Sequence, residues 1–389
     1  MKIFKRILRI FIVILLFIFI SISGLLYFFT RKDYTPPPVG RLTLNNNISI
    51  KQVDSVPLTF VSWNIGYCGL DKDMDFFYDG GKRVRPDQET LQKNLNGVFD
   101  FLSKNDSIDF FLIQEIDSFS KRSYYANQVS LFSKALPGHS CCFATNYNVL
   151  FVPLPVFNPM GQVLSGITTF SGYSPAKSER YSYPVNYSWP MKIFMLDRCF
   201  LMQRYKLSYS PKELVVINLH NSAFGDADVL RLYETWMLRS FLLSEFEKGN
   251  YVIAGGDWNQ NTPDYNILSF VPGFNKKTGL PKIPADYLPK GWHIVHDTLL
   301  PTNRDVNTAY QHGVTPTTIY DFFITSPNVS IERAGVINCG FEFSDHQPVF
   351  MRVRLNPDLV CGSRAEMKNA ISTMIDSVSK LTEKLNTEK

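Results

Sequence analysis

Short apolar runs recur along the chain between residues 58 and 353. The runs with the length of a β-strand are 58–63, 109–114, 148–152, 193–196, 214–219, 251–255, 319–324 and 348–353. Several are apolar at nearly every position, which is typical of strands in a sheet that is covered on both faces. Two segments have a helical period instead, at about 88–103 and at 226–247. The pattern predicts one large α/β or α+β domain over residues 57–356.

One part of this domain lacks a clear period. Residues 155–190 are rich in Ser, Tyr, Pro and Gly. Such composition marks turns and loops, so we expect long loops there on one side of the domain.

The N-terminus carries an apolar run of a different kind. Residues 10–29 contain no charge, and as a helix they would span roughly 30 Å, the thickness of a hydrocarbon core. Four basic residues precede the run, so residues 1–9 are predicted to be cytoplasmic and the rest of the chain extracytoplasmic. The alternative is a cleaved signal peptide, whose apolar region is usually about 7–15 residues long and ends at small residues. This run is longer and has no such site, which favours an uncleaved, single-pass transmembrane anchor.

Two further segments flank the domain. Residues 30–56 include the three prolines of "YTPPPVG" and are interpreted as a stiff, extended linker. Residues 357–389 are predicted to form an amphipathic helix with a short heptad seam, made of Met367, Ile371, Met374, Val378, Leu381 and Leu385. This helix packs on the domain or pairs with another chain. The first is the simpler expectation, and the oligomeric state stays open.

Charge and cysteine content narrow the classes of function. The net charge of +5 originates in residues 1–33, and the remaining chain is formally neutral. A neutral domain argues mildly against a nuclease, which would usually have a basic groove. The six cysteines show no CxxC spacing and give no support to a zinc site, so we expect most of them to be buried free thiols.

Polar side chains stand at the ends of several apolar runs. The segments are "SWNIG" with Asn64, "LIQEID" with Glu115, "INLHNSAF" with His220, "GGDWNQ" with Asp257 and Asn259, "IYDFFI" with Asp321, and "SDHQPV" with Asp345 and His346. Taken singly, each has an ordinary structural explanation, such as a turn. Together they supply oxygen ligands suited to Mg²⁺ or Mn²⁺ and histidines suited to phosphoester hydrolysis. We also expect Gly255 and Gly256 to let the backbone approach closely and turn.

In this order the six segments resemble the endonuclease/exonuclease/phosphatase superfamily, which has the deoxyribonuclease I-like fold. The likeness covers about residues 57–355. It implies a four-layer sandwich, with two mixed β-sheets packed face to face and helices outside. It also implies hydrolysis of phosphoesters with Mg²⁺ as cofactor, for which Mn²⁺ can substitute.

The resemblance assigns a role to each residue. Glu115 is expected to be the principal metal ligand, assisted by Asn64, with Asp345 beside the metal. Asp257 and Asn259 are expected to orient the attacking water and contact the phosphate, which His220 would also face. His346, oriented by Asp321, is expected to act as general base or to polarise the phosphate.

Basic residues near the predicted site are candidates for binding the substrate. The family often has an arginine where "SGITTFSGYS" has Gly172, and Arg198 is the candidate substitute. Lys82, Arg83 and Arg85 follow Asn64 and are candidates to attract a phosphate, with a solvated charged loop as the equal alternative.

Two functions follow from these expectations. The first is a membrane-anchored, metal-dependent phosphoesterase that acts on nucleic acid, a lipid headgroup or a small phosphate ester. The second is a catalytically inactive, membrane-anchored binding module with the same fold. Loss of Glu115, Asp257 or His346 would indicate the second, and all three are present.

Overall fold

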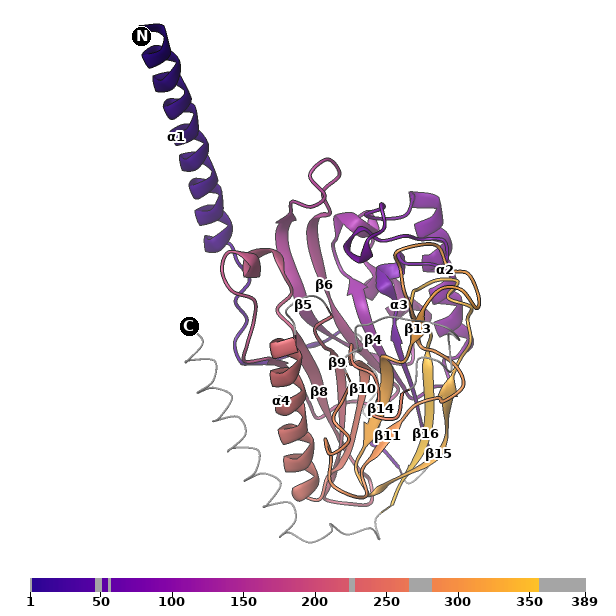
Figure 1. Ribbon diagram of the computed structural model, residues 1–389. Helices are drawn as coiled ribbons and strands as arrows, with labels where there is room; N and C mark the ends of the chain where they lie inside the picture. Colours follow the sequence, from indigo (N-terminus) through magenta and orange to yellow (C-terminus); the bar gives the residue numbers. More distant parts are fainter. Residues whose placement is uncertain (1, 46–50, 55–56, 224–227, 266–281, 357–389) are drawn as a thin grey trace.

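The computed structural model describes residues 2–45, 51–54, 57–223, 228–265 and 282–356. The helices are α1 (Lys2–Arg31), α2 (Gln88–Lys104), α3 (Gln128–Ala135) and α4 (Asp228–Glu247). Two seven-stranded sheets pack face to face, with α4 outside one and α2 and α3 outside the other (Figure 1). This is the predicted four-layer sandwich, and the resemblance is confirmed at the level of the fold.

The first sheet, called sheet A, has the strand order β1-β7-β8-β9-β10-β14-β11. Its strands are β1 (Val39–Arg41), β7 (Lys177–Ser182), β8 (Cys199–Lys206), β9 (Glu213–His220), β10 (Tyr251–Asp257), β14 (Asp321–Thr325) and β11 (His293–Val295). The central pair β9 and β10 is parallel, whereas the other pairs are antiparallel.

The second sheet, called sheet B, has the strand order β15-β16-β3-β4-β6-β5-β2. Its strands are β15 (Val329–Val336), β16 (Val349–Leu355), β3 (Leu58–Asn64), β4 (Phe110–Asp117), β6 (Gly161–Ser171), β5 (Ser140–Val152) and β2 (Leu44–Asn45). Here the parallel pair is β3 and β4. A short ribbon of β12 (Asn303–Arg304) and β13 (Thr317–Thr318) lies outside both sheets.

The apolar runs form three layers of core. Between the sheets, Phe60 stacks on Phe110 with ring centroids 4.5 Å apart, and Phe323 of sheet A meets Phe60 edge to face. Outside sheet A, the buried side of α4 packs on β9 and β10. Outside sheet B, α2 and α3 pack on β3 and β4. Each large side chain buried in this way stabilises the fold by about 1.5–3 kcal/mol, which explains why β3, β4, β9 and β10 are apolar on both faces.

Helix α2 shows how the local sequence sets an element. The Asp87 carboxylate caps it by accepting a hydrogen bond from the Thr90 N–H at 2.7 Å. Leu91, Leu95 and Leu102 recur on one face and are buried against sheet B. The predicted helix at 88–103 is therefore confirmed, as is the described part of the helix predicted at 226–247.

Two sequence predictions are wrong. Residues 193–196 are not a strand, because Met191–Phe194 form a 3₁₀ turn that follows Pro190. Residues 155–190 are not all loop, because they contain β6 and β7. Strand β6 was obscured by its serines and threonines, which are buried; the Ser165 hydroxyl, for example, donates to the Ile116 carbonyl.

The predicted linker also differs from a free spacer. Within residues 30–56, β1 pairs with β7 at the edge of sheet A, and β2 pairs with β5 at the edge of sheet B. Edge strands offer unpaired backbone groups that a passing segment can satisfy, so the chain is held to the body on its way to β3. The helix predicted at 357–389 lies outside the described residues and stays a prediction.

Helix α1 is long and apolar enough to cross a membrane. It stands away from the body in Figure 1, and its apolar side chains are exposed along most of its length. Among the described cysteines, Cys68, Cys141, Cys142 and Cys199 are buried free thiols and Cys339 is a half-buried one, as predicted.

Candidate active site

The polar strand ends meet at one end of the sandwich. The carboxyl ends of the two parallel pairs, β3–β4 and β9–β10, lie there together with the start of β14 and the segment before β16. In sheet A, Asp257 lies opposite His220 on one side and opposite Asp321 on the other. A cavity of about 430 Å³ opens here, and the predicted residues that line it are Glu115, Arg198, His220, Asp257, Asn259, Asp345 and His346.

The two glycines before Asp257 serve close packing within the strand. Gly256 has φ +152°, and a Cβ there would collide with the backbone of Leu219 on β9. A Cβ on Gly255 would collide with the Phe323 ring. The turn itself follows the strand, where Asp257 Oδ1 accepts from the Asn259 N–H at 2.9 Å and Asn259 has φ +49°. The expectation that the glycines make the turn is therefore wrong, although they do permit the close approach.

Glu115 reaches the cavity because of a bulge in β4. The register between β4 and β6 shifts between Ile113 and Ile116, and Glu115 has φ +51°. A bulge leaves its extra residue unpaired and re-aims the side chain. The Glu115 side chain is 25% exposed, whereas its neighbours Gln114 and Ile116 are fully buried.

Asn64 joins the carboxylates of the two sheets. Its Nδ2 donates to Asp257 Oδ2 at 2.9 Å and to Glu115 Oε1 at 3.3 Å, and its Oδ1 accepts from the Gly66 N–H at 3.0 Å. Gly66 has φ +48°, and a Cβ on it would lie 2.8 Å from Asp345 Oδ1. The glycine of "SWNIG" is thus required by the site. To be a metal ligand, Asn64 would have to turn its amide oxygen, which now accepts from the Gly66 N–H, toward an ion held by these carboxylates.

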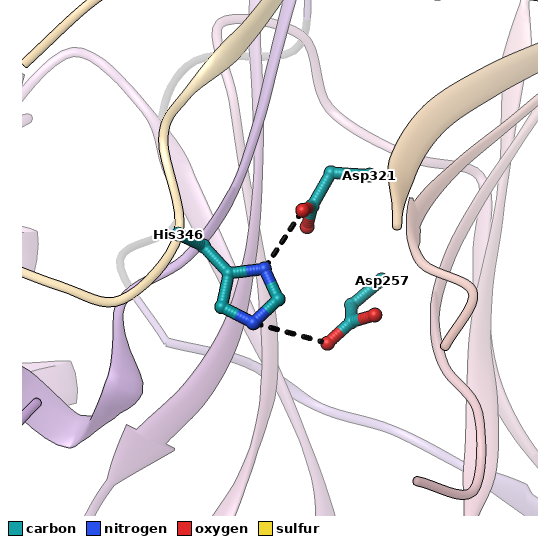
Figure 2. Close-up of side chains that lie close together, drawn as sticks. All are labelled: Asp257, Asp321 and His346. Carbon is teal, nitrogen blue, oxygen red and sulfur yellow. Dashed lines mark hydrogen bonds and ion pairs between the residues drawn. The ribbon is translucent and has the colours of Figure 1, made fainter. Parts of the chain in front are cut away.

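His346 is oriented by Asp321 (Figure 2). Its Nδ1 lies 2.7 Å from Asp321 Oδ2, and its Nε2 lies 3.7 Å from Asp257 Oδ2. Burial lowers the pKa of His346, but the carboxylates of Asp321, Asp257 and Asp345 outweigh it and raise the pKa well above its usual value. The neighbouring carboxylates therefore favour protonation of the His346 ring.

His220 has the opposite electrostatic setting. Its Nε2 lies 3.5 Å from Asp257 Oδ2 and 3.8 Å from Glu115 Oε1. Burial, together with the positive charge of Arg198, lowers the pKa of His220 well below its usual value. The cavity therefore holds one histidine that favours the charged form and one that favours the neutral form. Such a division is typical of sites that move protons.

The carboxylates are suited to a divalent cation. Burial raises the pKa of Asp257 to about 7, and burial followed by repulsion from Glu115 raises that of Asp345 to about 6. A cation among these oxygens would relieve the cost of their charges, and hard oxygen donors are those that Mg²⁺ and Mn²⁺ prefer. Donor atoms of Asp257, Asp321 and His346 also lie within 4.8 Å of one another. However, the Asp321–His346 hydrogen bond occupies two of these donors.

Comparison with known proteins bears on the fold. No protein-family model and no curated protein sequence matches the chain. An endonuclease/exonuclease/phosphatase structure from Beutenbergia cavernae is similar with a TM-score of 0.50 and 17% identity, over 77% of this chain and 72% of that chain. An endonuclease/exonuclease/phosphatase family structure from Bacteroides thetaiotaomicron is similar with a TM-score of 0.50 and 13% identity, over 79% of this chain and 99% of that chain. The chain has the endonuclease/exonuclease/phosphatase fold.

Three basic residues predicted to bind the substrate do not line the cavity of this endonuclease/exonuclease/phosphatase fold. Arg83 binds the Asp75 carboxylate, and Arg85 donates to the Pro159 carbonyl at 3.0 Å. Lys82 is exposed beside them. Arg83 and Arg85 hold loops together, and a role of the three residues in binding the substrate stays a prediction.

Arg198 and a residue that sequence reasoning missed supply positive charge to the cavity. Arg198 lines it, with Nη1 3.4 Å from the His220 carbonyl oxygen. Arg122 also lines it, paired with Asp117 at 2.9 Å and with its guanidinium 3.8 Å from the Tyr67 ring centroid. No motif marks Arg122, because its place depends on the turn that follows β4.

Asn303 is a second missed residue. It lies in β12, and its Nδ2 is 2.9 Å from His346 Nε2, the ring nitrogen that faces the cavity. The nearby Trp63 Nε1 donates to the His346 carbonyl at 3.0 Å and fixes the backbone there. The sequence around Asn303 is an unremarkable polar stretch, so only the tertiary structure reveals this contact.

Proposed function

We propose that this chain is a membrane-anchored, Mg²⁺-dependent hydrolase of phosphodiester or phosphomonoester bonds. The observation that carries the proposal is the convergence of Glu115, Asp257, His220 and the Asp321–His346 pair on one cavity. These residues come from both sheets, and their shared location supports a common chemical task.

The metal site of the proposal uses oxygen ligands. Glu115 and Asp345 would hold Mg²⁺, with Asn64 assisting, and Mn²⁺ suits the same donors. When bound, the cation supplies Lewis-acid stabilisation of the negative charge on the phosphate.

The side chains of the cavity then have separate tasks. Asp257, fixed by hydrogen bonds from Asn64 and the Asn259 N–H, orients the attacking water. The water oxygen bonds to phosphorus as the ester P–O bond breaks. His346 either accepts the water proton and passes it to the leaving-group oxygen, or donates a hydrogen bond to a phosphate oxygen. In the second case, which the raised pKa of His346 favours, Asp257 accepts the water proton and the leaving-group oxygen takes its proton from solvent. His220 and Asn259 contact the phosphate, which Arg198 attracts.

Helix α1 supports the membrane part of the proposal. Basic residues precede this candidate span, which favours a cytoplasmic N-terminus and a catalytic domain outside. The domain outside the span is formally neutral, which argues mildly against a nucleic-acid substrate. A lipid headgroup or a small phosphate ester fits better.

The test offers the full chain, in detergent micelles, four substrates: DNA, RNA, sphingomyelin and inositol phosphates. Each is incubated with Mg²⁺ or with EDTA and followed by phosphorus NMR. We expect hydrolysis of one class with Mg²⁺ only, and its loss in Glu115→Ala and in His346→Ala. The matched controls are Glu247→Ala and His312→Ala, whose side chains are exposed outside the cavity.

The outcomes separate the two functions. Activity retained by Glu115→Ala or His346→Ala would refute the assigned site. A folded wild-type chain that hydrolyses none of the four substrates would support the binding module instead.

A further inference from the structure

The turn between β5 and β6 exposes apolar side chains at its tip. Phe157 is fully exposed, Val156 is 72% exposed, and Leu154 is also exposed. Clustered exposed apolar side chains mark surfaces that meet a protein or a membrane.

A second exposed apolar segment holds the end of α1. The Trp189 Nε1 donates to Thr30 Oγ1 at 3.0 Å, and the Phe194 ring centroid lies 6.0 Å from that of Phe29. Phe29 ends the uncharged apolar run, so this segment sits at the level where the run would leave the hydrocarbon. The side chain of Trp189 is nevertheless 56% exposed, and that of the neighbouring Met191 is 54% exposed. Tryptophan is enriched at this membrane–water boundary.

The two segments lie on one side of the molecule. The β5–β6 turn projects from the body in the general direction in which α1 leaves it (Figure 1). The Tyr147 hydroxyl of β5 donates to the Phe194 carbonyl at 3.0 Å, which ties the hairpin to the segment that holds α1. We call Leu154, Val156, Phe157, Trp189 and Met191 together the apolar tip.

The apolar tip is continuous with the wall of the cavity. Met160, at the end of the β5–β6 turn, lines the cavity, as do Met195 and Leu196, which follow the 3₁₀ turn. In each of the two segments, residues of the apolar tip are therefore followed within a few positions by residues that line the cavity. A ligand that enters along them would meet apolar side chains first and the polar strand ends afterwards.

We propose that the apolar tip inserts into the headgroup region of the membrane that α1 spans, so that the cavity opens beside lipid phosphoesters. The inference rests on the proposed function and names its substrate class, a membrane lipid with a phosphoester headgroup. Few inserted side chains suffice, because α1 keeps the body next to the bilayer at a high effective concentration.

Depth-dependent fluorescence quenching tests the insertion. The full chain is reconstituted in phosphatidylcholine vesicles with brominated acyl chains, as Phe157→Trp in a Trp189→Phe background. Four native tryptophans remain in this background, so the emission of the introduced one is taken as the difference from Trp189→Phe alone. We expect this difference emission to be blue-shifted and quenched by the bromines. The matched control is Leu299→Trp in the same background, because Leu299 is 83% exposed and follows β11, at the opposite edge of sheet A from β1. The difference emission of the control should be that of a tryptophan in water and be unquenched.

Two results would overturn the proposal. One is a tryptophan at 157 that is as unquenched as the control. The other is blue-shifted emission without bromine quenching, which would assign the tip to contact with protein, such as a second copy of this chain.

Hydrolysis separates this inference from the proposed function. Val156→Asp with Phe157→Asp should reduce hydrolysis of vesicle phospholipid at least tenfold and leave that of soluble bis(p-nitrophenyl) phosphate unchanged. Quenching without any hydrolysis by the wild type would refute the proposed function and keep the insertion. Hydrolysis of the soluble ester without quenching would refute the insertion alone.

Discussion

Replacement of Asp321 by asparagine tests the link between the buried carboxylate and His346. Asp321 is fully buried, and its Oδ2 lies 2.7 Å from His346 Nδ1. Among the described residues, its Oδ1 has no hydrogen-bond partner. The asparagine keeps the shape and one acceptor oxygen but removes the negative charge, so the variant isolates the electrostatic contribution.

The expected loss follows from the strength of this contact. A hydrogen bond to a charged group contributes about 1.5–3 kcal/mol, against about 1 kcal/mol for a neutral pair. The lost difference of about 1–2 kcal/mol would lower kcat/KM about 5- to 30-fold, because 1.4 kcal/mol is tenfold in rate. Asp321 is the leading carboxylate among those that raise the pKa of His346, so this pKa should also fall in Asp321→Asn.

The assay is hydrolysis of bis(p-nitrophenyl) phosphate by the full chain between pH 5 and 9 with saturating Mg²⁺. If the imidazolium of His346 is active, the alkaline limb of the profile moves to lower pH. If the neutral imidazole is active, the acidic limb moves to lower pH. The control is Asp297→Asn, since Asp297 accepts backbone N–H groups outside the cavity. A kcat/KM within twofold of the wild type, with neither limb moved, would refute the assigned pair.

Two further predictions concern stability, both measured by urea unfolding of the full chain in micelles. Arg122→Met should lower the free energy of unfolding by about 3–5 kcal/mol, because it leaves the fully buried carboxylate of Asp117 without its ion pair. Adding Asp117→Asn to this variant should restore part of the lost free energy. A double variant as unstable as Arg122→Met would contradict the prediction. Although burial raises the pKa of Glu245, Arg204 outweighs it and lowers the pKa to about 2, so the ionised form stabilises the fold above pH 4.5. Above pH 4.5 the wild type should therefore have a free energy of unfolding about 3 kcal/mol higher than that of Glu245→Gln, and this difference should disappear as the pH falls from 4.5 to 2. A difference that does not change with pH would contradict the prediction.

Local patterns in the sequence predicted one large domain and its central strands, and the four-layer sandwich came from the resemblance. Strands β3, β4, β9 and β10 were predicted within a few residues, since burial on both faces demands continuous apolar runs. The polar residue that ends each run was visible as well. Because strand ends of parallel pairs share one edge of a sheet, their order also indicated a common site.

Strands with mixed composition could not be found in this way. Ser165 in β6 is buried, and its hydroxyl donates to the carbonyl of Ile116, 49 residues away in the sequence. The pattern of apolar residues along the chain does not indicate which distant groups will form such hydrogen bonds. For the same reason, the sequence of the linker did not indicate that β1 would pair at the edge of sheet A and β2 at the edge of sheet B.

The sequence by itself determined the long apolar run within α1, the central strands and the residue types of the site. The tertiary structure alone decided their geometry: the bulge that turns Glu115 into the cavity, and the placement of Arg122 and Asn303. It also decided that Trp63 would hold the backbone of His346, 283 residues further along the chain. Hydrophobic period is a property of neighbouring residues, whereas these contacts join segments that only the packing of two sheets brings together.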